Sequence, residues 1–196
     1  MTTSMAPVAV TTPTTLEQRL LTASLLVAPA TYLAADTTYA ARGWEDATAG
    51  VLHVLASIAY GFVFLCVAGW LAPASRLRAA IVVVGLVGME GSVAYGFDTI
   101  HMSLGDTHLV DQPGAANLIK PLGLFLPLAI ALVGAALLRL GARWQGGVVV
   151  VAAVAFPVAH IGNIAPLCVT VAVALVLGLG SLLWQPPATD PRPAVG

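Results

Sequence analysis

The chain has 196 residues, of which 59% are hydrophobic and 9% are charged, and its formal net charge is −1. Soluble domains carry about 25% charged residues, so the composition excludes an ordinary soluble globular protein. Nucleic-acid binding is excluded as well, because the sequence has no basic patch. The composition predicts a protein embedded in lipid.

The two ends of the sequence differ from the rest. Residues 1–15 are rich in Thr and carry no charge, and residues 185–196 contain four prolines. Segments of this kind cannot bury enough apolar surface to offset the entropy of ordering, and closely spaced prolines prevent a regular helix. We therefore predict a disordered tail at each end.

Between the tails lie six apolar segments, at 20–41, 50–72, 79–100, 121–138, 146–161 and 164–184. About 20 helical residues cross a hydrocarbon core of about 30 Å. The sequence therefore predicts an all-α, polytopic membrane protein, in which residues 16–184 form a bundle of six transmembrane helices.

The first apolar segment has a second interpretation. Arg19 precedes an apolar stretch that ends in small residues, which is typical of a cleaved signal peptide covering residues 1–35. We favour a membrane span, because the apolar stretch continues past Asp36 to Arg42 and so reaches spanning length. The signal-peptide alternative stays open at this point.

The basic residues predict the orientation. One side of the membrane would carry Arg19, Arg76, Arg78, Arg139, Arg143 and Arg192. The other side would carry only Arg42 and Lys120. Because cytoplasmic loops are enriched in Lys and Arg, both termini are predicted to be cytoplasmic, and the protein is expected in the cell membrane of a bacterium.

The third segment contains three ionisable residues. On a helix, His101 falls about 20° from Glu90 and Asp98 about 80° away, so these residues form one polar stripe that Phe97 shares. On another side of the same helix lie three glycines, which allow a second helix to approach closely: Gly88, Gly91 and Gly96. These glycines could mediate a homo-oligomer or a larger membrane complex.

Other segments place polar residues at a similar depth. Asp36 lies one turn from Tyr32 in the first segment, and His53 is followed by Ser57 and Tyr60 in the second. The fifth segment ends at His160 with Asn163 just beyond it. A charge on the lipid face of a helix costs several kcal/mol, so we expect these groups to surround a pocket in the outer half of the bilayer. The loop 102–119, with Asp106, His108 and Asp111, could cover it.

This pattern predicts a site that binds a lipophilic small molecule, or converts it by acid–base chemistry of the isomerase, cyclase or hydrolase type. Glu90 would be the general acid, Asp98 or Asp36 the base, and His101 or His53 a proton relay. The ligand-binding residues would be Tyr32, Ser57, Tyr60, Phe97 and Asn163. Each residue also has a purely structural interpretation, such as a hydrogen bond from Glu90 to a neighbouring helix.

Three alternatives stay open. Histidines on separate helices can bind haem or a divalent metal, and the candidates are His53, His101 and His160. The sequence lacks HExxH and CxxCH, so this signal is weak. A proton-coupled transporter would use Glu90 as its coupling site. A non-catalytic membrane subunit would use the glycine side of the third helix to contact a partner.

Overall fold

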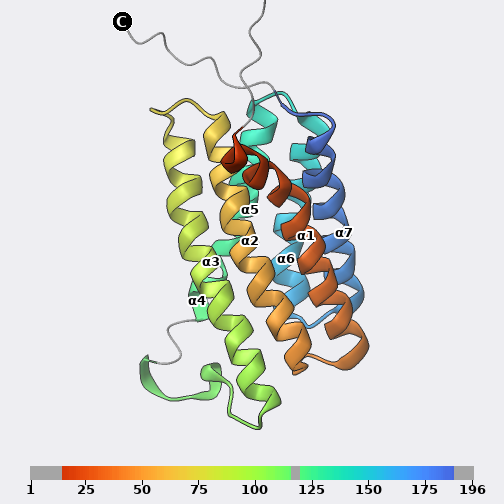
Figure 1. The fold of residues 1–196 in the computed structure, drawn as a ribbon. Coiled ribbons are helices and arrows are strands. Elements are labelled where there is room, and N and C mark those ends of the chain that lie inside the picture. The colour runs from red at the N-terminus through yellow and green to blue at the C-terminus, as the bar shows by residue number, and fades with distance from the viewer. Residues whose placement is uncertain (1–14, 116–119, 188–196) are drawn as a thin grey trace, which may run out of the picture.

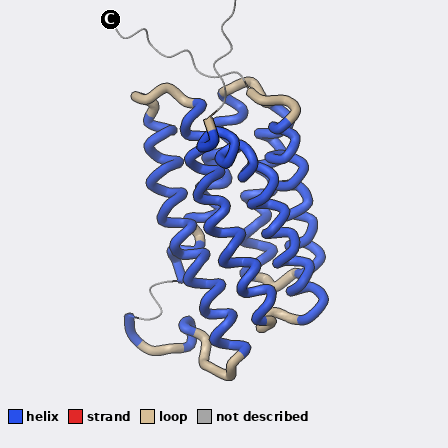
Figure 2. The backbone as a smooth tube through the Cα atoms, viewed as in Figure 1, coloured by secondary structure: helices blue, strands red, loops and turns tan. Residues whose placement is uncertain are grey.

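The fold is seen in a computed structural model that describes residues 15–115 and 120–187. All regular structure in these residues is helical (Figure 2). The helices are α1 (Leu16–Arg42), α2 (Ala47–Trp70), α3 (Arg76–Ser103), α4 (Lys120–Gly123), α5 (Phe125–Arg139), α6 (Arg143–Ile161) and α7 (Ala165–Gly180), with two 3-10 turns, η1 (Leu109–Asp111) and η3 (Ser181–Leu183). Apart from Thr15 and residues 185–187, the predicted tails lie outside the described residues.

Among the described residues, six helical stretches are long and apolar enough to cross a membrane. They correspond to the six predicted segments, with one difference: the fourth stretch, Pro121–Arg139, is broken at Leu124 into α4 and α5. The break follows from Pro127, which has no N–H for the carbonyl of Gly123 four residues earlier and whose ring collides with it.

The first helix is a structural part of the bundle. Thr15 caps α1 through a hydrogen bond from the Gln18 amide, in a reciprocal capping box. The helix runs unbroken to Arg42 and buries Tyr32, Asp36 and Tyr39 between its neighbours. This arrangement is the one expected of a helix that belongs to the folded bundle.

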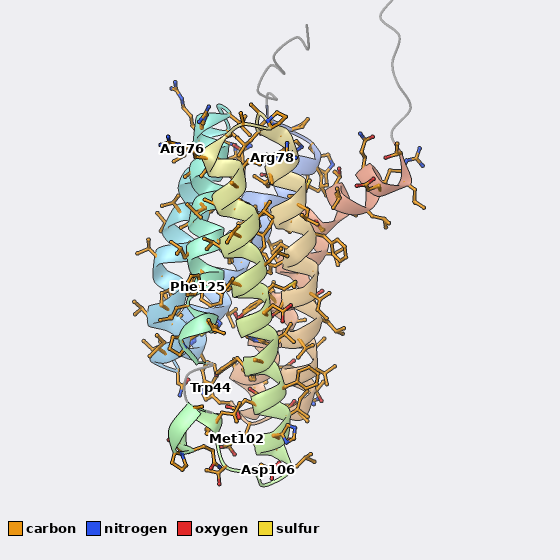
Figure 3. The ribbon with its side chains drawn as sticks, turned by 90° about the vertical axis from the view of Figure 1, so that its left-hand side faces the viewer. Trp44, Arg76, Arg78, Met102, Asp106 and Phe125 are labelled. Carbon is orange, nitrogen blue, oxygen red and sulfur yellow. The ribbon has the colours of Figure 1, made fainter. Side chains whose placement is uncertain are left out.

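The six long helices form a closed ring. In order around it, α1 contacts α2, α2 contacts α3, α3 contacts α5, α5 contacts α6, α6 contacts α7, and α7 returns to α1 (Figure 1). Short connections make sequential helices antiparallel. We call the end with loops 71–75 and 140–142 the arginine end, and the end with loops 43–46, 104–115 and 162–164 the histidine end. Figure 3 labels Arg76 and Arg78 at the first end and Asp106 at the second.

The interior changes character along the bundle. Toward the arginine end it is mostly aliphatic and aromatic, with side chains such as Phe64, Ile81 and Leu137, and its buried polar residues are Ser24 and Gln145. Toward the histidine end the buried residues include polar ones: Asp36, His53, Ser57, Ser92, Asp98 and Thr99. Buried polar groups need hydrogen-bond partners, so this half of the bundle is organised by specific contacts between helices.

The glycines of α3 are used within the chain. A Cβ added at Gly88 would collide with the backbone of Leu126, and one at Gly91 with the backbone of Leu122. A Cβ at Gly96 would lie 2.7 Å from Val54 on α2. The helices that approach these glycines are therefore α2, α4 and α5 of the same chain, which corrects the expectation that the glycines face a partner protein.

We expect Gly91→Leu to destabilise the fold by more than the about 1–3 kcal/mol typical of an overpacked core, because the new side chain meets backbone that cannot move aside. The measurement is the free energy of unfolding in detergent. Gly69→Leu is the matched control, since a Cβ at the exposed Gly69 has no atom within 4 Å. Equal stability of the two variants would contradict this packing.

The fifth helix leaves a gap in the ring. α5 has 15 residues and is about 22 Å long, whereas α3 has 28 residues and is about 42 Å long. Phe125, the first residue of α5, lies about midway along the bundle (Figure 3). From Gly91 to the histidine end, α3 therefore has no full-length neighbour on its α5 side.

Candidate functional site

The gap beside α3 contains a cavity of about 490 Å³. This volume lies within the range of about 300–1,000 Å³ typical of small-molecule sites. Its apolar wall includes Leu124, Pro127, Phe156 and Pro157, from the broken fourth stretch and from α6. Its polar wall contains His53, Ser92, Tyr95, Asp98, His108 and His160. The cavity thus combines apolar surface with ionisable groups from four parts of the chain.

A chain of hydrogen bonds links α2 to α3 at the cavity wall. Nε2 of His53 lies 3.0 Å from Oγ of Ser92, and Oγ of Ser92 lies 2.8 Å from Oγ of Ser57. Ser57 donates its own hydroxyl hydrogen to the carbonyl of His53, at 2.7 Å. All three side chains are buried, so these bonds fix the relative position of the two helices.

A second set of contacts holds the loop after α3 over the cavity. Gly105, with φ of +91°, ends α3 in a left-handed conformation that favours glycine. Nδ1 of His108 then lies 2.9 Å from Oδ2 of Asp98, and the Leu109 amide donates to Oδ1 of Asp98 at 3.1 Å. Asp98 is only 5% exposed. This single carboxylate therefore fastens the loop and places His108 against the cavity.

A third contact joins the first and the sixth helices of the chain. Nε2 of His160 lies 3.1 Å from Oδ1 of Asp36, and Nδ1 of His160 donates to the carbonyl of Phe156 at 3.0 Å. The Phe156 ring is stacked on the His160 ring, with centroids 4.0 Å apart. Both ring nitrogens of His160 are thus engaged, and the ring is held in one orientation.

The ring of Tyr32 packs at the centre of these groups. Its centroid lies 4.9 Å from that of His53, 5.4 Å from Phe156 and 5.7 Å from His160. Tyr32 is buried and lines the cavity. It therefore forms part of the cavity wall and packs between the rings of His53 and His160.

Four buried polar atoms of this region have no hydrogen-bond partner among the described residues: Oδ2 of Asp36, the hydroxyls of Tyr39 and Tyr60, and Nδ1 of His53. Most buried polar groups in proteins are paired. Orphaned atoms gathered on two adjacent helices mark this part of the bundle as specialised for something other than packing.

The structure brings together many of the residues singled out in the sequence. Tyr32, His53, Asp98, His160 and Asn163 line the cavity. Asp36 and Ser57 lie one contact behind this wall, bonded to His160 and Ser92 respectively. Tyr60 is fully buried beside Tyr32, with ring centroids 6.0 Å apart.

The expected position of Glu90 in this cavity is wrong, and the same holds for Phe97 and His101. All three side chains are exposed on the outer side of α3, where Phe97 is 53% and the His101 side chain 63% exposed. His101 pairs with Asp106 at 2.8 Å, and together with Phe97 it lines a second hollow that shares Ala94 and Asp98 with this cavity. The reason is that α2, α4 and α5 pack against the sides of α3 that carry its glycines, so the side with Glu90 faces outward.

The three histidines proposed as metal ligands do not meet. His101 is exposed, whereas His53 and His160 are buried and bonded to Ser92 and Asp36. Within residues 15–115 and 120–187, no group of three or more His, Cys, Asp or Glu side chains is arranged to hold a metal ion. The geometry therefore gives no support to His53, His101 and His160 as a joint ligand set for haem or a metal.

Two residues of the cavity wall were missed in the sequence, Ser92 and Tyr95, and His108 was predicted only as part of a loop that could cover the pocket. A signal existed for the first two, since Ser92, Tyr95 and Asp98 recur at i, i+3 and i+6 and so share one side of α3. His108 carries no comparable signal, because its position depends on how the loop folds back onto Asp98.

Comparison of the chain with protein-family models, with curated proteins and with solved structures finds no match in any of the three. The geometry of the cavity therefore stands as the basis for the function.

Proposed function

We propose that this protein is a multi-pass protein of a bacterial cell membrane, with its arginine end in the cytoplasm. Six apolar helices of spanning length support insertion. Arg76, Arg78, Arg139 and Arg143 all lie at or beside the loops of one end, which supports the orientation by the positive-inside rule. In this orientation the cavity opens in the outer half of the bilayer.

Within the membrane, the protein binds a lipophilic small molecule in the cavity of about 490 Å³. The observation that carries this proposal is that one cavity, left by the short α5, is lined both by apolar side chains and by His53, Asp98 and His108. Such a lining matches a molecule with an apolar body and one polar head, and the bilayer supplies molecules of that kind directly.

The same cavity is suited to acid–base conversion of its ligand. Asp98 holds Nδ1 of His108, which orients the ring as a carboxylate orients the histidine of a catalytic dyad, and leaves Nε2 for proton transfer. In an isomerisation, Nε2 would take a proton from one atom of the ligand and return it to another, so that the ring ends unchanged.

Serine hydrolase chemistry is disfavoured at this wall. Although Ser92 lies 3.0 Å from His53, its hydroxyl hydrogen is directed to Ser57, because Ser57 has already donated its own to a carbonyl. The hydroxyl of Ser92 therefore does not donate to a base that could remove its proton and make it a nucleophile. The isomerase or cyclase type fits better than the hydrolase type.

The test is to fill the cavity. Ala94 lies on the wall of the cavity, so we expect a lipophilic molecule to co-purify with the wild-type protein and Ala94→Phe to abolish its binding. The measurement is mass spectrometry of organic extracts from equal amounts of purified protein. Ala79→Phe, at an exposed position of the same helix, is the matched control and should retain the compound. Identical extracts from both variants would contradict the proposal.

A further inference from the structure

The directions of the hydrogen bonds on the polar wall can be deduced from the contacts. Ser57 donates to the carbonyl of His53, so at its contact with Ser92 it can only accept. Ser92 therefore donates to Ser57 and accepts the hydrogen on Nε2 of His53. As a result, the oxygen of Ser92 has one lone pair left for a ligand and no hydrogen to offer.

Asp98 and His108 present acceptors too, whereas the hydroxyl of Tyr95 can either donate or accept. Both oxygens of Asp98 are acceptors and are occupied by Nδ1 of His108 and the amide of Leu109. Nδ1 of His108 is thus the nitrogen that carries hydrogen, and Nε2 carries a lone pair in the uncharged ring. In His53, Nε2 carries the hydrogen, so the buried Nδ1 is an acceptor, and it lacks a partner among the described residues.

His160 does not reverse this pattern. Its Nδ1 donates to the carbonyl of Phe156 and its Nε2 is directed at Asp36, so neither nitrogen is free to donate into the cavity. Ser92 and His108 therefore offer acceptors toward a ligand, whereas the free Nδ1 of His53 is buried, and Asp98 adds negative charge beside them.

We propose that the polar head of the ligand is a hydrogen-bond donor, a hydroxyl or an amine, which is bound by Nε2 of His108 and the oxygen of Ser92. The ligands would then be lipophilic alcohols or amines rather than fatty acids or ethers, because an ether has no donor and a carboxylate is repelled by Asp98. This inference rests on the proposed function and names the ligand class of the same cavity.

The test uses four probes with the same 12-carbon chain: dodecanol, dodecylamine, dodecyl methyl ether and dodecanoate. The protein is held in lipid nanodiscs at pH 8, and native mass spectrometry counts the bound probe. For the wild-type protein we expect dodecanol or dodecylamine to bind about tenfold more tightly than the ether, the value of one good hydrogen bond. Tighter binding of dodecylamine than of dodecanol would identify the ligand as an amine, and the reverse order would identify it as an alcohol.

The decisive variant is His108→Asn. Its side-chain NH₂ can still donate to Asp98 from the position of Nδ1 and so keep the loop in place, but it has no atom at the position of Nε2. We expect the preference for the donor probes over the ether to disappear. His101→Asn makes the same substitution in the exposed pair with Asp106 and should keep the preference. Each probe partitions into the nanodisc lipid to the same extent whichever variant is present. A change in the ratio of bound donor probe to bound ether between variants therefore reports on binding by the protein.

Two negative results are distinguishable. Equal binding of dodecanol and its ether by the wild-type protein, tighter binding of dodecanoate, or an unchanged preference in His108→Asn overturns the inference and leaves the proposed function standing. Binding of all four probes that Ala94→Phe does not reduce overturns both, since the cavity would not be the site.

Discussion

Asp36→Leu is expected to lower the free energy of unfolding by about 3–5 kcal/mol, the cost of removing one partner of a buried ionic pair. Asp36 is 1% exposed and accepts a hydrogen bond from Nε2 of His160. The other ring nitrogen of His160, Nδ1, donates to the carbonyl of Phe156. Without the carboxylate, Nε2 of His160 stays enclosed against apolar atoms with nothing to bond. The measurement is reversible unfolding in mixed micelles, followed by helical circular dichroism.

The double variant Asp36→Leu, His160→Phe separates the pair from general damage to the core. A phenylalanine at position 160 can keep the stacking on Phe156 while removing the orphaned nitrogen. We expect the double variant to be more stable than Asp36→Leu alone, because both members of the pair are then replaced by apolar groups. Strictly additive losses would show that Asp36 and His160 do not stabilise the fold as a pair.

Asp98→Ala is expected to release the loop that covers the cavity. The Leu109 amide should then exchange its hydrogen about 10–100-fold faster, because a hydrogen bond to a charged group contributes about 1.5–3 kcal/mol. The same substitution should also remove acid–base conversion of the ligand, since His108 loses the carboxylate that orients it. Hydrogen–deuterium exchange resolved to the peptide containing Leu109 measures the first effect.

Asp106→Ala provides the matched control for this experiment. It breaks a His–Asp contact of similar length in the same loop, but one whose two side chains are both at least 60% exposed. Exposed pairs contribute about 0–1 kcal/mol, so the Leu109 amide should exchange almost as in the wild-type protein. If both variants accelerate exchange equally, Asp98 is not the anchor of the loop.

The number and positions of the helices were predictable because hydrocarbon thickness and hydropathy fix the length of a span. The position of the break at Leu124 was not predicted, although Pro127 carries the signal for it. Prolines are common in membrane helices and often only bend them, as Pro29 and Pro157 lie within unbroken helices here. Whether a proline ends a helix depends on how the neighbouring helices pack against the freed carbonyl.

The inward side of α3 could not be chosen from the sequence. The sequence prediction put Asp98 on one stripe with Glu90 and His101, whereas in the fold Asp98 faces inward with Ser92 and the other two face outward. An ionisable residue normally faces the interior of a bundle, so the whole stripe was predicted to face inward. The close approaches at Gly88 and Gly91 fix the sides of α3 that contact α5 and α4, so the side with Glu90 faces outward. Such contacts become known only from the fold.

The central claim is that α5 stops halfway along the bundle and that the space beyond it holds a lipophilic molecule. A crystal structure of the protein grown from a lipid mesophase tests this directly. We predict elongated electron density between α3 and α6, with its polar end against His108 and Ser92 and its apolar end against Pro127 and Phe156. A helix that continues unbroken through Leu124 and closes the gap, with Glu90 turned into the bundle, would contradict it.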